Sequence, residues 1–76
     1  MVLAFVLGIV ESGKETEVVD KLRGMERVTD AHVVYGKYDI HMTLEIDDLS
    51  ELSRMNTEIR KIGGVTSTET LIATIF

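Results

Sequence analysis

Tyr38 and Asp39 end a short run, Val34-Tyr-Gly-Lys-Tyr-Asp39, that carries the most informative side chains of this chain. Gly36 permits a tight turn where another residue would be strained. Residues 40–46, Ile-His-Met-Thr-Leu-Glu-Ile, alternate apolar and polar types without a break, which is typical of a half-buried strand. The run therefore predicts a hairpin tip at which an aromatic ring and a carboxylate stand beside accessible backbone, a suitable place to hold a small polar ligand.

Two histidines, His32 and His41, raise the question of metal binding. With a two-residue turn at Gly36–Lys37 they would face each other across the hairpin, with Asp39 and Thr43 on the same face. Structural zinc sites usually use four ligands, with cysteine common among them, and this chain has no cysteine. We therefore expect a polar pair at a subunit contact, no metal site and no cofactor, and the alternative that the two histidines and a carboxylate bind zinc stays open.

Enzyme signatures are missing from the sequence. It contains no Ser-His-Asp order, no phosphate-binding loop and no cysteine nucleophile. Some small dimeric α+β proteins are cofactor-free oxygenases or isomerases, and here only His32, His41 and Asp39 could serve such chemistry. We expect a protein that is not an enzyme, with this cofactor-free activity as a remaining alternative.

Length and charge narrow the class of protein further. The chain has 76 residues, which is one small domain, and its apolar content of 45% is high enough to predict a contact with another subunit. Its net charge of −5, with 8 basic residues scattered among 13 acidic ones, argues against direct binding to nucleic acid. The apolar first ten residues are too short to span a bilayer and lack the basic start of a signal peptide, so the expected location is the cytoplasm.

Four strands are predicted from apolar patterning. Val2–Val10 is apolar on both faces, as in a central strand that is covered on both sides. Residues 28–35, 40–46 and 65–76 follow as further strands, and the alternation in each of them leaves one side more polar than the other.

Two helices are predicted between these strands. Ser12–Glu15 and Asp48–Glu51 both match a capping box, which marks a helix start. An apolar stripe at helical spacing follows each box, and the stripes stop at Gly24 and at Gly63–Gly64. The two halves of the chain therefore repeat one plan of strand, helix and strand.

The resulting βαββαβ order predicts an α+β, ferredoxin-like sandwich: a four-stranded antiparallel sheet with both helices on one face. The other face stays uncovered. Strand alternation places on it one face of the first strand together with Asp30, His32, Val34, Asp39, His41, Thr43, Glu45, Thr66, Thr68, Thr70, Ile72 and Thr74. Such a mixed surface is typical of a subunit interface with room for a polar guest.

The hairpin run, the alternating strand and the later run Gly64-Val65-x-x-Thr68-x-Thr70 together resemble a known family. They are similar to the effector-binding half of the Lrp/AsnC transcriptional regulators, called the RAM domain (regulation of amino-acid metabolism). The resemblance extends from Ala4 to the last strand, so residues 1–76 are expected to form one RAM-like domain. Gly63 departs from the family, which often has proline there.

The resemblance implies a homodimer through the sheet, a ring of dimers that is commonly an octamer, and a free amino acid bound between subunits. Its site residues carry over to Gly36, Tyr38, Asp39, Thr68 and Thr70. A zwitterion needs acceptors for its ammonium and donors for its carboxylate; an aspartate supplies the first, and threonine hydroxyls and turn N–H groups supply the second.

The first strand starts at residue 2, so no helix-turn-helix is expected and the DNA-binding role of the family is not carried over. The expected function is a stand-alone amino-acid-binding module that modulates full-length Lrp/AsnC regulators indirectly. Besides the cofactor-free enzyme, two alternatives remain open: an interaction module that co-assembles with such regulators without a ligand, and an ACT-type amino-acid-binding domain, in which Gly13 would be the loop glycine.

Overall fold

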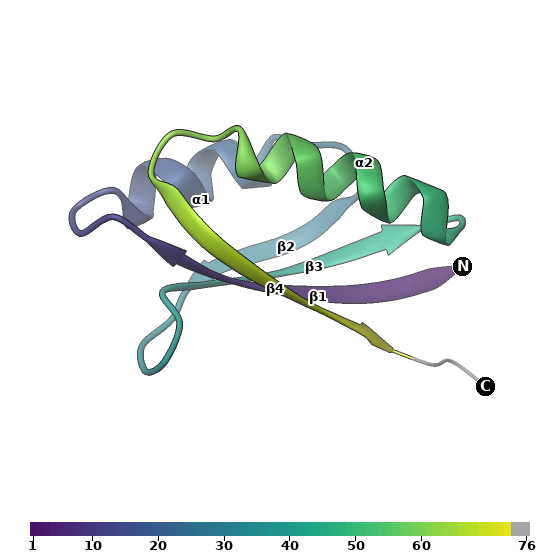
Figure 1. The fold of residues 1–76 in the computed structure, drawn as a ribbon, viewed down its shortest axis with the longest axis horizontal. Coiled ribbons are helices and arrows are strands. Elements are labelled where there is room, and N and C mark those ends of the chain that lie inside the picture. The colour runs from purple at the N-terminus through teal and green to yellow at the C-terminus, as the bar shows by residue number, and fades with distance from the viewer. Residues whose placement is uncertain (74–76) are drawn as a thin grey trace.

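The computed structural model describes residues 1–73 and contains six elements. In chain order they are β1 (Val2–Val10), α1 (Glu15–Arg23), β2 (Val28–Val33), β3 (Ile40–Ile46), α2 (Leu49–Arg60) and β4 (Val65–Ala73). This order confirms the predicted ferredoxin-like sandwich (Figure 1).

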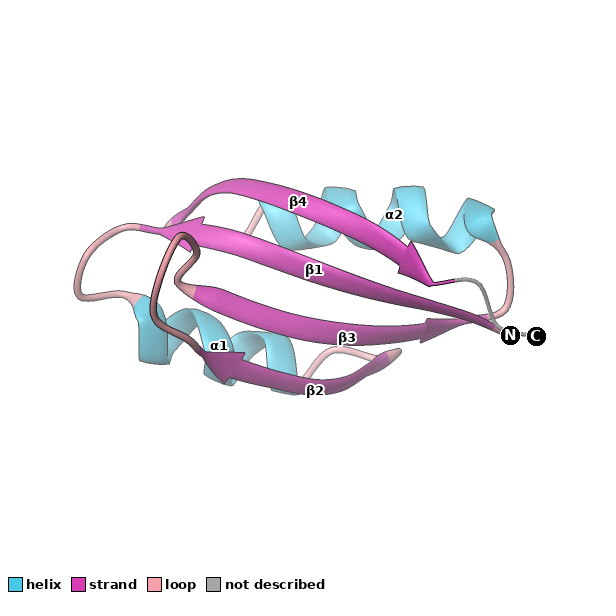
Figure 2. Ribbon diagram, turned by 90° about the horizontal axis from the view of Figure 1, so that it is seen from below, coloured by secondary structure: helices cyan, strands magenta, loops and turns pink. Residues whose placement is uncertain are grey.

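The four strands form one antiparallel sheet in the order β2-β3-β1-β4. Both helices cover the same side of this sheet, and the other side, which we call the open face, has no helix over it (Figures 1 and 2). β1 is central, as its double apolar pattern predicts, while β2 and β4 are edge strands. No helix within residues 1–73 is long and apolar enough to cross a membrane.

The core lies between the sheet and the helices. Alternate residues of β1 and β3 point into it, and the apolar stripes of α1 and α2 close it from above. Its side chains are Ala4, Val6, Val10, Val18, Val19, Leu22, Ala31, Ile40, Met42, Leu44, Ile46, Met55 and Ile59. The strict alternation of residues 40–46 thus corresponds to buried apolar and outward polar positions, as the sequence predicts.

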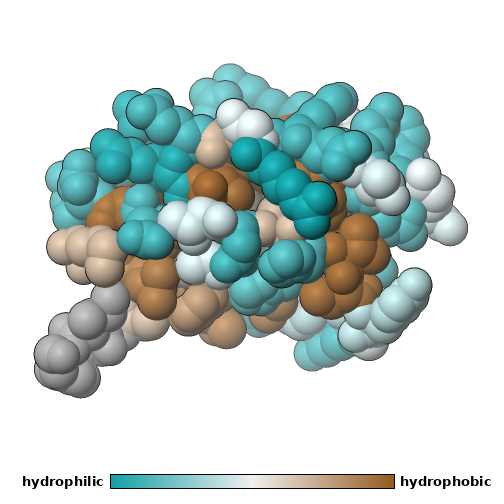
Figure 3. Space-filling view, turned by 180° about the vertical axis from the view of Figure 1, so that it is seen from behind, coloured by the Kyte–Doolittle hydropathy of each residue, from teal (hydrophilic) through white to brown (hydrophobic). Residues whose placement is uncertain are grey.

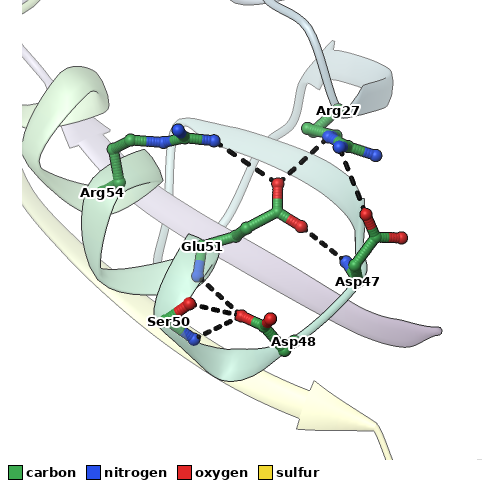
Figure 4. Close-up of polar contacts among 6 residues, drawn as sticks. All are labelled: Arg27, Asp47, Asp48, Ser50, Glu51 and Arg54. Atoms are coloured by element: carbon green, nitrogen blue, oxygen red, sulfur yellow. Dashed lines mark hydrogen bonds and ion pairs between the residues drawn. The ribbon is translucent and has the colours of Figure 1, made fainter.

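The second predicted capping box is confirmed in its cap residue Asp48, although the Glu51 side chain accepts from the Asp47 N–H and not from that of Asp48. The first predicted box is wrong. The Asp48 side chain accepts hydrogen bonds from the backbone N–H groups of Ser50 and Glu51, at 2.9 and 3.3 Å, and thereby caps α2 (Figure 4). α1 begins at Glu15 after Lys14, and Ser12 does not cap it. The reason lies in the loop before the helix, where Gly13 takes a φ of +90° and the chain reverses after Ser12.

The predicted C-terminal ends of the two helices also differ in outcome. α1 ends at Arg23, directly before Gly24, as predicted, whereas α2 ends at Arg60, before the predicted stop at Gly63–Gly64. The strands also need adjustment, because β2 stops at Val33 and not at residue 35. β4 is described as far as Ala73, and the rest of the predicted strand at 65–76, Thr74 included, lies outside the described residues.

Candidate functional site

The β2–β3 connection forms a corner of residues 34–39 that projects on the side of the open face (Figures 1 and 2). It is longer than the predicted two-residue turn, and Gly36 within it has a φ of +121°. The backbone N–H of Val34 donates to the carbonyl of Asp39 at 2.9 Å and closes the corner. The corner adds the same number of residues on each side of the predicted turn at Gly36–Lys37, so Val33 pairs with Ile40 and His32 pairs with His41, as the sequence predicts.

Asp39 is held by β1 at two points. Its backbone N–H donates to the Gly8 carbonyl at 2.8 Å, and its Oδ2 accepts the Val10 N–H at 2.9 Å. The carboxylate is half-buried there. Asp39 therefore braces the corner with one oxygen, and no hydrogen bond among residues 1–73 uses its Oδ1.

Tyr38 reaches over the sheet to the edge strand β4. Its Oη donates to Oε1 of Glu69 at 2.5 Å, and Lys37 Nζ lies 5.9 Å from the centre of its ring. The hydrogen bond to Glu69 raises the pKa of the Tyr38 hydroxyl above its usual value of 10.0. Tyr38 thus ties the corner to β4 instead of pointing freely into solvent.

Thr68 and Thr70 do not lie on the face where the sequence analysis expected them. In the register of β1 and β4 they stand opposite Gly8 and Val6, which belong to the helix-covered side. The Thr70 hydroxyl donates a hydrogen bond to Asn56 Oδ1 of α2 at 3.3 Å, which confirms that Thr70 faces the helices. Thr68 and Asp39 therefore both lie beside Gly8, Thr68 through strand pairing and Asp39 through its N–H bond to the Gly8 carbonyl. Both threonines lie on the opposite side of the sheet from the one predicted.

Three further residues that were predicted on the open face also lie at other positions in the structure. Ile72 pairs with buried Ala4 and also lies on the helix side, while Val34 lies beyond the end of β2. Thr66 sits at an irregularity in the pairing of β1 with β4, and its Oγ1 donates to the Ile9 carbonyl at 3.0 Å. The predicted placement is therefore wrong for Ile72 and is not tested by strand pairing for Val34 and Thr66. It is confirmed for the paired residues of β2 and β3, which are Asp30, His32, His41, Thr43 and Glu45.

A pocket of about 370 Å³ adjoins Asp39. Its walls come from the corner and from the first turn of α1, and they are Glu15, Thr16, Val33, Val34, Tyr35 and Asp39. It offers two carboxylates, which can accept hydrogen bonds from an ammonium, beside valines and an aromatic ring that can contact an apolar group. The sequence analysis missed Glu15 and Thr16, because it assigned Glu15 to a capping box and gave no reason to bring α1 to the hairpin.

The open face itself carries an apolar stripe bordered by polar groups. The stripe consists of Leu3, Phe5, Leu7 and Ile9 of β1 with Leu71 of β4. On one side it is bordered by Asp30, His32, His41, Thr43 and Glu45, and on the other by Ser67 and Glu69. In Figure 3 hydrophilic side chains cover the helical half of the molecule, and hydrophobic ones gather toward the sheet. Ile9 and Leu71 remain 40% and 51% exposed, so the stripe is apolar surface that another chain can cover.

The fold and this corner define a small α+β ligand-binding domain of the regulatory type. The chain belongs to the Lrp/AsnC ligand-binding domain family, whose model matches residues 3–74. The predicted membership is thereby confirmed, and the family is one of regulatory ligand-binding domains and not of enzymes.

Known proteins agree with this membership. The HTH-type transcriptional regulator FL11 of Pyrococcus furiosus is 31% identical over 71 residues, which cover 93% of this chain and 47% of FL11. The chain therefore spans about half the length of that regulator. Hypothetical protein PHS023 of Pyrococcus horikoshii superposes with a TM-score of 0.92 at 44% identity, covering 100% of this chain and 93% of PHS023. TTHA0845 of Thermus thermophilus superposes with a TM-score of 0.94 at 28% identity, covering 100% of this chain and 96% of TTHA0845.

Proposed function

We propose that this chain is a sensor of a free amino acid, and that it modulates transcription regulators indirectly through its state of assembly. The membership in a regulatory ligand-binding family supports the sensor role. The observation that carries the choice of ligand is the pocket beside Asp39, in which Asp39 and Glu15 offer acceptors and Val33, Val34 and Tyr35 offer apolar contact. An amino acid would place its ammonium at the carboxylates and its side chain on this apolar wall.

The carboxylate of the amino acid needs hydrogen-bond donors. The backbone around Gly36 offers N–H groups, and Thr68 and Thr70 offer hydroxyls from the edge strand β4. Because β4 lies at the opposite edge of the sheet from β2, whose Val33 lines the pocket, we assign these threonines to a ligand shared with a neighbouring subunit. The complete site then combines Gly36, Tyr38 and Asp39 of one copy with Thr68 and Thr70 of the next.

Assembly is proposed to begin with two copies joined through their open faces. The apolar stripe supports this choice, since its exposed leucine and isoleucine lose contact with water on association. Dimers would then form a ring through contacts that include the ligand site. A ligand bound between subunits shifts the assembly by the difference of its affinity for the two states, which in turn changes how the chain associates with a full-length Lrp/AsnC regulator.

The decisive experiment for the ligand is isothermal titration of the chain with each of the twenty amino acids. Asp39→Asn is the informative variant because an amide oxygen still accepts from the Val10 N–H while the charge is lost. We expect it to weaken binding about ten- to a hundredfold, which corresponds to a hydrogen bond to a charged group of about 1.5–3 kcal/mol. Asp30→Asn removes a carboxylate of the open face and is the matched control. If no amino acid binds at millimolar concentration, the sensor proposal is wrong.

Light scattering tests the assembly. Leu7→Glu puts a charge into the apolar stripe and should lower the mass in solution to that of a monomer. Leu49→Glu makes the same change at a leucine that is 56% exposed at the start of α2, and should leave the mass unchanged. A wild-type chain with the mass of a monomer would contradict the proposed dimer.

A second candidate is a module that assembles with regulators and binds no small molecule. The observation in its favour is that Asp39 and Tyr38 both make hydrogen bonds inside the chain, to Val10 and Glu69, and so have a structural role without a ligand. Native mass spectrometry of this chain mixed with a full-length regulator separates the two candidates. Mixed oligomers that form equally with and without amino acids favour the second.

A further inference from the structure

His32 and His41 form a directly opposed pair across β2 and β3 on the open face. Directly opposed residues of an antiparallel pair have Cβ atoms about 4.5–5.5 Å apart, so their side chains extend from the sheet in parallel. His32 is exposed, and His41 is half-buried. The His41 ring stacks on Phe5 of β1, with ring centroids 5.9 Å apart and an angle of 28° between the planes. One imidazole is therefore held in place, and the other is free to turn toward it.

The imidazole nitrogens of this pair are available to a ligand. Among residues 1–73 no hydrogen bond or ion pair uses a side-chain nitrogen of His32 or His41. The described part of the chain also has no cluster of three or more metal-ligating residues. Each copy would thus supply two imidazoles as protein ligands to an ion bound here.

We propose that the His32–His41 pair binds one transition-metal ion, such as Zn²⁺, Cu²⁺ or Ni²⁺, as a two-imidazole ligand set. Imidazole suits these ions, and metal–nitrogen bonds of about 2.0–2.1 Å bring the two nitrogens within about 4 Å of each other, which two opposed histidines can reach. Asp30 and Glu45 lie on the same face, and with the net charge of −5 they favour the approach of a cation without ligating it.

The remaining coordination positions are open to water or to the same pair of a second copy. The binding of the ion itself needs neither the dimer nor the amino-acid site, so it does not depend on the proposed function. An ion shared by two copies would fasten the open faces together, and metal availability would then be a second input to the assembly.

The test uses the untagged chain, because a polyhistidine tag would bind the same ions. Zn²⁺ is titrated calorimetrically, and Cu²⁺ is followed by electron paramagnetic resonance, whose hyperfine pattern reports nitrogen ligands. The variants are His32→Asn at the exposed position and His41→Phe, which keeps a ring against Phe5. Asp30→Asn, two residues before His32 on the same face, is the matched control, and circular dichroism verifies that each variant is folded.

We expect saturable binding by the wild type and by Asp30→Asn, two-nitrogen ligation of Cu²⁺, and loss of binding in both histidine variants. Binding that persists in either histidine variant overturns the proposal. Binding that is lost in Asp30→Asn and kept in the histidine variants also overturns it, since it would reflect diffuse attraction to the acidic surface.

Discussion

Arg27 and Gly64 occupy equivalent positions in the two halves of the domain, one residue before β2 and one residue before β4. Both have a left-handed backbone, with φ of 78° for Arg27 and 105° for Gly64. The hydrogen bonds around them match as well, since the Val28 N–H donates to the Met25 carbonyl at 3.3 Å and the Val65 N–H donates to the Ile62 carbonyl at 3.2 Å. The internal repeat predicted from the sequence is therefore a structural repeat, with a non-glycine residue in one of its two left-handed positions.

We predict that Gly64→Ala destabilises the fold more than Arg27→Ala does. A Cβ at Gly64 would lie 3.1 Å from Lys14 Cδ and 3.3 Å from Val18 Cγ2, in addition to the left-handed strain of about 1–2 kcal/mol. Arg27→Ala keeps the strain that is already present and loses only the partly exposed ion pairs to Asp47 and Glu51, at 3.3 and 3.2 Å (Figure 4). Urea unfolding at one fixed protein concentration measures the difference.

A second substitution at Arg27 gives the control for this prediction. Arg27→Gly removes the left-handed strain together with the ion pairs, and exposed pairs contribute about 0–1 kcal/mol. It should therefore be more stable than Arg27→Ala by up to about 1 kcal/mol. Equal stability of the two Arg27 variants would show that the backbone at this position is not strained.

A second prediction separates the structural role of Asp39 from its proposed role in binding. Asp39→Ala leaves the part-buried Val10 N–H without its acceptor, which costs about 1–3 kcal/mol of unfolding free energy. Asp39→Asn retains an acceptor oxygen and should lose less than half of that amount. Urea unfolding compares the two variants, and an equal loss in both would mean that the charge of Asp39 stabilises the corner, and not only its hydrogen bond.

A third prediction concerns the contact between Gly8 and Ile40. A Cβ on Gly8 would lie 2.9 Å from Ile40 Cγ1 and 3.0 Å from Cδ1, in a part of the core where Ile40 is fully buried. Gly8→Ala should therefore cost about 1–3 kcal/mol through overpacking. Ile40→Val removes Cδ1 and should recover part of this loss in the double variant, which a double-mutant cycle of thermal or urea unfolding measures. Additive losses would indicate that the backbone, and not Ile40, absorbs the extra atom.

The architecture was predictable because apolar periodicity and turn residues specify it. The alternation of residues 40–46 defined β3 and its buried side, and Gly36 placed His32 opposite His41 even though the corner is longer than predicted. The regular fold follows from such local patterns, since each predicts burial directly.

The face of β4 was not predictable in the same way. β4 is an edge strand that α2 covers only partly, so both of its sides keep exposed residues: Leu71 and Ile72 are each 51% exposed and lie on opposite sides. Polarity therefore does not indicate which side faces the helices, and the threonines suggested the wrong one. The contribution of α1 to the pocket was missed for a related reason: contacts between elements distant in the chain leave no periodic signal.

A final prediction follows from the cap of α2. The hydrogen bonds that Asp48 accepts, first from the Ser50 hydroxyl and then from the backbone N–H groups of Glu51 and Ser50, hold the pKa of its carboxyl below the usual 3.8. A carboxyl whose pKa is lowered by folding stabilises the native state fully above its unfolded pKa, and this stabilisation disappears as the pH falls through the folded pKa. Asp48→Asn, which still caps the helix, should thus be less stable than wild type at pH 7, and the difference should vanish in strong acid. Thermal unfolding of both proteins across the acid range measures it, and a difference that stays constant with pH would contradict the assignment of the cap to the ionised carboxylate.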